Sequence, residues 1–361
     1  MKAAIFHGPN QPLTIEQVEI DKPQSREVLV RTMATGVCHS DLHFVDGLYP
    51  YPAPAILGHE AAGIVEAVGD QVTAFKPGDH VISCLSVFCG SCKYCLGGRM
   101  SLCNAKPGRK PGVDAPYFTW NGNPVFQFLN ISSYAEKMLL HENALVKIQD
   151  DMPFEQAALI GCGVTTGVGA VLNTAKVPPG ATVAVFGCGG VGLAAIQGAK
   201  LAGAGMIIAV DMLESKLKTA RDMGATHVID ASTGDAAAKI RDMTGGGVEY
   251  AFEAIGNKRA AEQCFEAIEA GGTATIIGMI PVGQKIELSG SAFLSEKKIQ
   301  GSNMGSNHFR TDMPKYIDFY KRGLLNLDDM ITRRLKLEDV NEAFRAMKAG
   351  EVARSVITFD N

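Results

Sequence analysis

The stretch Thr182–Gly192, which reads T-V-A-V-F-G-C-G-G-V-G, decides the fold of this chain. Five residues suited to a strand run into a glycine cluster, and the alanine-rich segment Val191–Leu201 follows. This order predicts a strand, a tight turn and a helix. Gly187 would permit the turn, Gly189 would let the backbone approach a pyrophosphate, and Gly192 would let the helix pack closely on the strand.

The acid that ends the next predicted strand strengthens this interpretation. Asp211 comes 19 residues after Gly192, a spacing at which a carboxylate holds the adenosine ribose hydroxyls of a dinucleotide. Gly190 and Val191 begin the predicted helix, so free N–H groups there would meet the phosphates. The alternative, a tight turn beside a solvated aspartate, leaves the strand–turn–helix context unexplained.

Asp211 also indicates which dinucleotide is used. Two unit charges about 4 Å apart at an effective dielectric constant of about 20 repel by roughly 4 kcal/mol, or about three decades of affinity against a 2′-phosphate. NAD is therefore favoured over NADP. Lys216 either hydrogen-bonds the ribose or offsets this repulsion, with a solvated helix lysine as the alternative.

Outward from this stretch, short apolar runs alternate with segments of helical composition from about Pro178 to Ser302. Strands at this spacing predict right-handed βαβ units and a doubly wound parallel sheet. Ile280, after the last run, is a further expected cofactor contact. The predicted strands are Thr182–Phe186, Met206–Val210, His227–Ile229, Tyr250–Phe252 and Thr273–Ile277, and the predicted helices are Val191–Leu201, Ser215–Met223 and Lys258–Ala270.

The N-terminal part has a different pattern, with short apolar runs separated by Gly/Pro turns such as Lys76–Asp79. Few helical periods occur there, so a mostly β domain is predicted. We expect residues 1–163 and 302–361 to form this domain, and residues 164–301 to form the dinucleotide-binding domain. The fold class is therefore α/β with two domains, as 361 residues also suggest.

Charge and cysteine usage limit the function classes. A net charge of −4 with scattered lysines and arginines excludes nucleic acid and anionic membranes as expected partners. No signal-like segment is present, so we expect a cytoplasmic protein. We expect its partner to be a small molecule. Nine cysteines, an odd number, argue against a disulfide framework and for metal or redox chemistry.

Four of the cysteines are close neighbours. Cys89, Cys92, Cys95 and Cys103 have the spacing C-x2-C-x2-C-x7-C, which is typical of a closed, tetrahedral, structural zinc site. An iron–sulfur cluster is the chemical alternative, and an interaction or nucleic-acid zinc module is the functional one. We expect a zinc lobe at about residues 84–110.

Three further residues, Cys38, His59 and Cys162, lie 21 and 103 residues apart, so spacing alone does not join them. Four motifs do occur in a familiar order: G-H-E-A-A-G-I-V at Gly58–Val65, the four-cysteine lobe, G-C-G at Gly161–Gly163, and the glycine turn. In this the chain resembles the zinc-containing medium-chain alcohol dehydrogenases. It looks closest to the glutathione-dependent formaldehyde (class III) and aryl-alcohol dehydrogenases.

The resemblance implies a GroES-like β domain followed by a Rossmann domain. Positions matching Cys38, His59 and Cys162 bind a catalytic zinc in that family, and the lobe binds a structural one. Two zinc ions per chain are thus implied. Glu60 matches a carboxylate thought to approach the catalytic metal transiently.

The resemblance also implies a proton relay and cofactor contacts. Ser40 and His43 match residues that pass the alcohol's proton to solvent, although His43 has the alternative of a solvated turn histidine. Thr166 resembles a nicotinamide contact. Arg354 resembles an arginine that binds the pyrophosphate, with a plain surface arginine as the alternative. His39 stands where many relatives have a phosphate-binding arginine, so the cofactor is expected to bind more loosely.

We expect reversible NAD-linked oxidation of a primary hydrophobic or aromatic alcohol to its aldehyde, with Tyr49 and Leu85 lining the substrate pocket or simply the core. One alternative is an S-(hydroxymethyl)glutathione dehydrogenase, although Asp46 is the only acid in residues 46–54, where those relatives carry more. Another is a nicotinoprotein that retains its NAD, because Leu325–Met330 also resembles such relatives. A homodimer is expected, with a homotetramer as the alternative.

Overall fold

The structure, a computed structural model, describes residues 1–359 and divides into two compact units. The first comprises Met1–Cys162, His308–Arg322 and the C-terminal segment from Leu327. The second comprises Gly163–Asn307 and Gly323–Asn326.

The second unit extends further along the chain than the expected 164–301. Residues 302–307 belong to it because Gly305 packs so closely on Gly169 that a side chain at either position would collide with the other backbone. The excursion Gly323–Asn326 belongs to it as well. There the buried side chain of Gln197 donates to Asn326 O at 3.1 Å and accepts from Asn326 N at 2.6 Å.

The predicted doubly wound sheet is confirmed in the second unit. Its six strands are all parallel and follow the order β14-β13-β12-β15-β16-β17. The strands are β12 (Thr182–Phe186), β13 (Met206–Asp211), β14 (His227–Asp230), β15 (Val248–Glu253), β16 (Ile268–Ile276) and β17 (Lys298–Gly301). The helices are α4 (Thr165–Gly169), α5 (Gly190–Leu201), α6 (Glu214–Asp222), α7 (Ala236–Thr244) and α8 (Lys258–Glu266).

The alternating direction of the side chains along β12 explains how helices cover the sheet. Ala184 and Phe186 pack in one apolar cluster with Ile240 of α7 and Phe265 of α8. Because successive side chains of a strand point to opposite faces, Val183 and the other intervening residues face the other side. All of these residues are fully or almost fully buried, as expected for a parallel sheet.

One predicted helix, Lys258–Ala270, is too long. Helix α8 ends at Glu266, and β16 begins at Ile268, which is fully buried and pairs with Val248. The apolar periodicity continued past the helix end because a buried strand residue fits the same pattern. Helix α7 and the edge strand β17 lay outside the predicted elements.

The first unit is built from two sheets. One has the order β2-β1-β5-β9-β8-β3, and the other has the order β11-β7-β6-β4-β19-β18, with β10 also paired to β4. The first sheet contains β1 (Lys2–Phe6), β2 (Thr14–Gln17), β3 (Glu19–Ile20), β5 (Ala55–Ile56), β8 (Phe118–Trp120) and β9 (Asn123–Gln127). The second contains β4 (Glu27–Val37), β6 (Ala61–Val68), β7 (His80–Ser83), β10 (Lys137–His141), β11 (Leu145–Lys147), β18 (Ile331–Leu335) and β19 (Arg354–Thr358).

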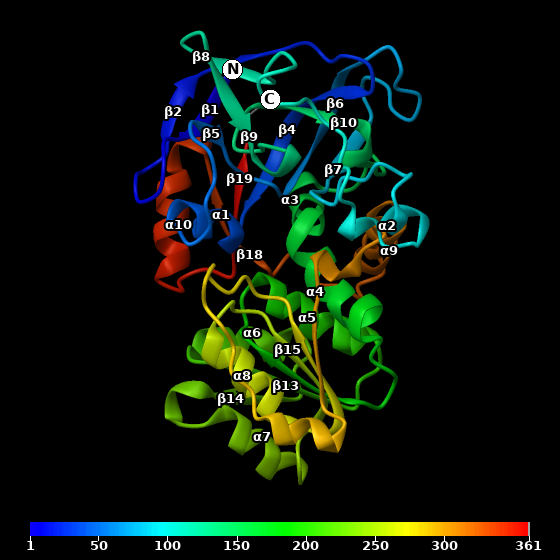
Figure 1. The fold of residues 1–361 in the computed structure, drawn as a ribbon, viewed down its shortest axis with the longest axis vertical. Helices are drawn as coiled ribbons and strands as arrows, with labels where there is room; N and C mark the ends of the chain where they lie inside the picture. The colour runs from blue at the N-terminus through cyan, green and yellow to red at the C-terminus, as the bar shows by residue number, and fades with distance from the viewer. Residues whose placement is uncertain (360–361) are drawn as a thin grey trace. The chain divides into compact units, whose positions relative to one another are not determined.

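The C-terminal strand completes this second sheet. In Figure 1 the red β19 lies beside the blue β4, to which it is antiparallel. The helices of the unit are α1 (His39–Val45), α2 (Lys93–Leu96), α3 (Phe154–Leu159), α9 (Phe309–Lys321) and α10 (Val340–Lys348).

The pairing of β4 with β6 sets the position of two predicted ligands. Thr35 of β4 is opposite Ala61 of β6 in an antiparallel register. Cys38 follows Thr35 by three residues and His59 precedes Ala61 by two, so both reach the same end of the strand pair. Cys162 lies in a π-helical turn, Ile160–Val164, that follows α3.

Within residues 1–359, one helical stretch is long and apolar enough to cross a membrane. It is the 22-residue segment Phe154–Ala175, and 83% of its most apolar window is buried inside the protein. Core helices of globular proteins have the same composition.

Candidate functional site

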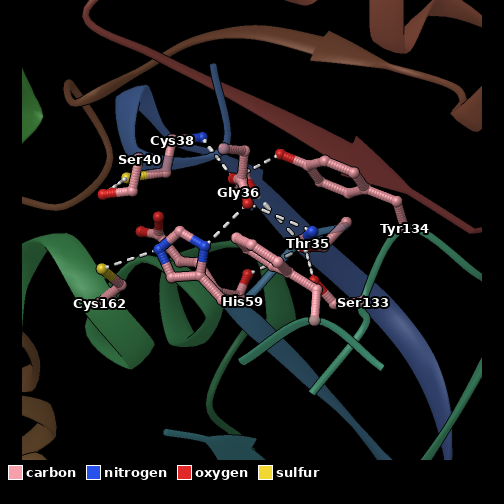
Figure 2. A network of polar contacts seen from close by, with 12 residues as sticks. Thr35, Gly36, Cys38, Ser40, His59, Ser133, Tyr134 and Cys162 are labelled. Atoms are coloured by element: carbon pink, nitrogen blue, oxygen red, sulfur yellow. Dashed lines mark hydrogen bonds and ion pairs between the residues drawn. The ribbon is translucent and has the colours of Figure 1, made fainter. Parts of the chain in front are cut away.

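Cys38, His59 and Cys162 form a buried cluster in the first unit. Their candidate ligand atoms all lie within 4.8 Å of one another. Figure 2 shows the His59 ring facing the Cys162 sulfur, with His59 Nε2 and Cys162 Sγ 3.2 Å apart. Donors around a tetrahedral zinc, at about 2.0 Å for nitrogen and about 2.3 Å for sulfur, are separated by about 3.5–3.8 Å. This donor set therefore fits zinc and leaves a fourth position for another ligand.

The two thiols of the cluster differ in acidity. A hydrogen bond with Cys162 holds the pKa of Cys38 well below its ordinary value, against the effect of burial. The same interaction and burial raise the pKa of Cys162 well above its ordinary value. One thiolate thus forms readily, and a divalent cation would stabilise the second.

The buried carboxylate of Glu60 pairs with Arg354. Arg354 Nη2 donates to Glu60 Oε2, and the two side chains are 4% and 0% exposed. Burial raises the pKa of Glu60 to about 7, while Arg354 opposes this rise. Within the described residues, Glu60 Oε1 and Arg354 Nε have no hydrogen-bond partner. The surface-arginine alternative for Arg354 is therefore wrong.

Ser40 and His43 both lie on α1, which begins directly after Cys38. Residues three apart on a helix lie on the same face, and the Cys38 thiol donates to Ser40 Oγ at 3.7 Å. His43 is half-buried in the helix, not in a turn as the alternative supposed, and burial lowers its pKa. No described residue hydrogen-bonds its Nδ1. Ser40 and a neutral His43 are thus placed on one side of the cluster.

Aromatic rings adjoin the cluster. Phe128 packs edge-on against His59 with ring centroids 6.1 Å apart, and against Phe44 at 4.8 Å. Tyr49 in turn packs on Phe44 at 5.8 Å and on His43 at 6.0 Å. An apolar, largely aromatic wall thus extends from a predicted metal ligand to a predicted pocket residue.

The second expected pocket residue, Leu85, is half-buried. It packs on the apolar cluster that contains Val87 and Ile131, and its carbonyl accepts a hydrogen bond from Lys106 Nζ at 2.9 Å. The alternative that Leu85 is a core residue therefore describes part of its environment.

The four cysteines of the lobe also converge. Their ligand atoms lie within 4.8 Å of one another, and the Sγ–Sγ distances from Cys92 are 3.5 Å to Cys95 and 3.9 Å to Cys103. The N–H groups of Ser91 and Cys92 lower the pKa of Cys89 to about 6. Four sulfurs at this spacing fit a closed tetrahedral site, as predicted.

The glycine turn has the predicted geometry. Helix α5 begins at Gly190, and a Cβ added at Gly189 would meet open space. A Cβ at Gly192 would instead collide with the Gly187 carbonyl. The loop therefore leaves room for a ligand at Gly189 while its helix packs tightly at Gly192.

Asp211 is tied to this turn. Its Oδ2 accepts the Cys188 N–H at 2.8 Å, and its Oδ1 accepts the Met212 N–H at 2.8 Å and the Leu213 N–H at 3.2 Å. These three N–H groups fix a half-buried carboxylate beside the glycines.

The other expected cofactor residues of the second unit lie in three places. Thr166 is buried on α4 and donates to Met304 Sδ at 3.3 Å. Lys216 is half-buried on α6, and Ile280 is half-buried after β16. His39 lies in the first unit, as the exposed first residue of α1.

Two buried acids were missed from the sequence. Asp41 accepts from His59 Nδ1 at 2.9 Å, and its place three residues after Cys38 was an available signal. Glu253 ends β15 next to Phe186, and its Oε1 accepts the N–H groups of Ile255 and Gly256 at 2.8 and 2.7 Å. Glu253 therefore fixes the turn that neighbours the glycine turn.

Comparisons with known proteins agree with this geometry. Residues 24–150 match the alcohol dehydrogenase GroES-like domain, and residues 190–322 match the zinc-binding dehydrogenase family. The chain is 40% identical to a class-3 alcohol dehydrogenase of Cereibacter sphaeroides and 38% identical to an S-(hydroxymethyl)glutathione dehydrogenase of Paracoccus denitrificans, with 99% of both chains covered in each case. A benzyl alcohol dehydrogenase from Acinetobacter calcoaceticus superposes with a TM-score of 0.93 and 35% identity over 99% of each chain.

Proposed function

Because this chain belongs to the zinc-dependent medium-chain alcohol dehydrogenase family, we propose that it carries two zinc ions and uses NAD to oxidise primary aromatic or other apolar alcohols. Zinc, a nicotinamide cofactor and an alcohol or aldehyde substrate follow from the family. The number of metals, the choice of NAD and the kind of alcohol are our proposal. The convergence of Cys38, His59 and Cys162 carries it.

The two metal sites have separate roles. Cys38, His59 and Cys162 would hold a catalytic zinc, since three protein ligands leave one position for substrate. The four lobe cysteines would hold a structural zinc with all positions filled. A zinc ion at the first site supplies Lewis-acid activation of the alcohol oxygen.

The chain's own residues then move the proton. Ser40 Oγ would accept the alcohol's proton, and His43 would release it to solvent. The His43 imidazole suits this role because burial lowers its pKa, so the ring is neutral at pH 7. A positioned base of this kind contributes about 10²–10⁴ in rate.

The choice of NAD rests on Asp211. Three backbone N–H groups hold its carboxylate beside the glycine turn, where it would accept from the ribose hydroxyls and repel a 2′-phosphate. Gly189 and the start of α5 would receive the pyrophosphate.

Aromatic substrates are favoured by the rings of Phe128, Phe44 and Tyr49 beside the metal ligand His59. The benzyl alcohol dehydrogenase of similar structure supports this choice. The second candidate is S-(hydroxymethyl)glutathione, the substrate in the name of a 38%-identical relative. Against it, Asp46, the only acid in residues 46–54, is already paired with Lys348 at 2.5 Å.

We further propose a homodimer in the cytoplasm. Strand β17 has β16 on one side and, within the described residues, an unpaired outer edge on the other. Such an edge is usually covered. None of the nine cysteines forms a disulfide, which suits a reducing compartment.

The deciding experiment is elemental analysis combined with a substrate panel. We expect about two zinc ions per chain, one of which is lost in Cys162→Ser and the other in Cys92→Ser. Dialysed protein with added NAD should oxidise benzyl alcohol faster than formaldehyde plus glutathione. One zinc in the unaltered protein, or activity only with glutathione, would contradict the proposal. Activity without added NAD would instead indicate a retained cofactor.

A further inference from the structure

We propose that Tyr134 is a positioning residue of the Cys38–His59–Cys162 site, acting through Asp41 on the orientation of the His59 ring. The inference rests on the proposed function of that site as a zinc site. Tyr134 lies 93 residues from Asp41 in the sequence, and its hydroxyl donates to Asp41 Oδ2 at 2.7 Å.

Asp41 is the link between the tyrosine and the ligand. Its Oδ1 contacts His59 Nδ1 at 2.9 Å and accepts the Gly58 N–H at 3.2 Å, while its Oδ2 accepts the Cys38 N–H at 3.3 Å. The Asp41 carboxylate thus occupies the Nδ1 side of the His59 ring. Nε2 is therefore the ring nitrogen that faces Cys162 and that a metal would use.

The Tyr134 hydroxyl is a fixed donor. Its side chain is fully buried, and burial raises its pKa well above the ordinary value, so the phenol keeps its proton. The backbone is held on both sides, because Tyr134 N donates to Leu57 O at 3.0 Å and Tyr134 O accepts from Ala4 N at 2.8 Å. The ring also packs on Phe344 with centroids 6.2 Å apart.

The neighbouring residue ties this segment to the ligand loop. Ser133 N donates to Gly58 O at 3.0 Å, and Ser133 Oγ shares a hydrogen bond of 2.7 Å with Thr35 Oγ1. Figure 2 shows Tyr134 and Ser133 on one side of the site, to the right of His59. Gly58 has no room for a side chain here, since a Cβ would lie 2.5 Å from Ser133 Oγ.

Tyr134 holds the Asp41 carboxylate from a different place in the fold than Cys38 and Gly58 do. Their N–H groups belong to the same loops that carry Cys38 and His59. Among residues 1–359, Tyr134 is the one hydrogen-bond partner of the Asp41 carboxylate that lies outside the two ligand loops. Its hydroxyl therefore fixes where Asp41 stands, and hence the direction in which His59 Nε2 points.

The test is zinc release from the complete protein to a chromogenic chelator. The phase that belongs to this site is identified as the one missing in Cys162→Ser. Outer partners of metal ligands are worth 10–100-fold in affinity, so Tyr134→Phe should accelerate this phase by about tenfold. The phase from the lobe should not change. The ring stays in place, so packing is preserved.

A matched variant and a double-variant cycle separate positioning from general loosening. The matched variant is Tyr117→Phe, which also removes a buried tyrosine hydroxyl. That hydroxyl accepts the Arg109 N–H at 2.9 Å and is not linked to Asp41 by the described hydrogen bonds. Tyr117→Phe should therefore leave both phases unchanged. In an Asp41→Ala background, Tyr134→Phe should alter release by about twofold or less. In cobalt(II)-loaded protein, Tyr134→Phe should shift the visible d–d bands of this site alone.

The outcomes are distinguishable. Equal acceleration of both phases, or of the same phase in Tyr117→Phe, would show a merely structural role and overturn the inference. An unchanged phase in Tyr134→Phe would overturn it too, with the zinc assignment intact. If Cys162→Ser has the same zinc content as the unaltered protein, the proposed function itself fails.

Discussion

Arg354 and Glu60 form an ion pair in which both side chains are buried, although 294 residues separate them in the sequence. The pair connects β19 to the residue immediately before β6, next to the proposed metal ligand His59. Strand β19 therefore contributes directly to the electrostatics of the proposed metal site.

Arg354→Ala should lower the free energy of unfolding by about 3–5 kcal/mol, because it leaves Glu60 as an unpaired buried carboxylate. Denaturant unfolding monitored by circular dichroism measures this. Glu60→Gln in the same chain should restore much of the loss. Arg345→Ala, which removes an exposed pair with Glu342, should have a much smaller effect, and equal losses in the two arginine variants would refute the argument.

The two glycines of the turn should respond differently to alanine. Gly189→Ala should change stability by about 1 kcal/mol or less but weaken NAD binding, because its Cβ enters the open space proposed for the pyrophosphate. Gly192→Ala should destabilise the protein by at least about 1–3 kcal/mol, because its Cβ meets the Gly187 carbonyl. Thermal unfolding and NAD titration by fluorescence measure both. Tight NAD binding by Gly189→Ala would disprove the pyrophosphate assignment.

Asp211→Asn should reduce the preference for NAD over NADP, measured as the ratio of the two kcat/KM values, by up to about three decades. The charge that repels a 2′-phosphate is lost, while one side-chain oxygen remains as an acceptor. Asp230 ends the neighbouring strand in register with Asp211 and supplies the control. If Asp230→Asn changed the ratio as much, proximity to the ribose would not be the cause.

His43→Gln should slow turnover at pH 7 by up to about 10²-fold. Burial lowers the pKa of His43, so the neutral, proton-accepting form persists below the ordinary value of about 6.5. Activity of the unaltered protein should therefore fall on the acid side only below about pH 6.5. The variant should recover toward alkaline pH, where hydroxide replaces the base. His141, whose pKa burial also lowers, is the control position; a pH profile unchanged in His43→Gln would exclude the relay.

What could be predicted depended on sequence separation. The glycine turn and the lobe were predictable because their residues are neighbours, and β12 matches the predicted Thr182–Phe186. The cluster of Cys38, His59 and Cys162 could be predicted only from family resemblance. The strand pairing that brings Cys38 close to His59 leaves no local pattern in the sequence. The hydrogen bond between Tyr134 and Asp41 joins residues 93 apart. A tyrosine in a loop gives no sign of such a partner.

The pairing of Gln197 with Asn326 bears on how the nucleotide-binding unit could be excised. A fragment of residues 163–307 would contain the whole parallel sheet but would lack Asn326, which satisfies both ends of the buried Gln197 amide. An unsatisfied buried amide costs about 1–3 kcal/mol per group. A stable fragment would therefore need Gly323–Asn326 grafted through a linker, or an apolar replacement at position 197.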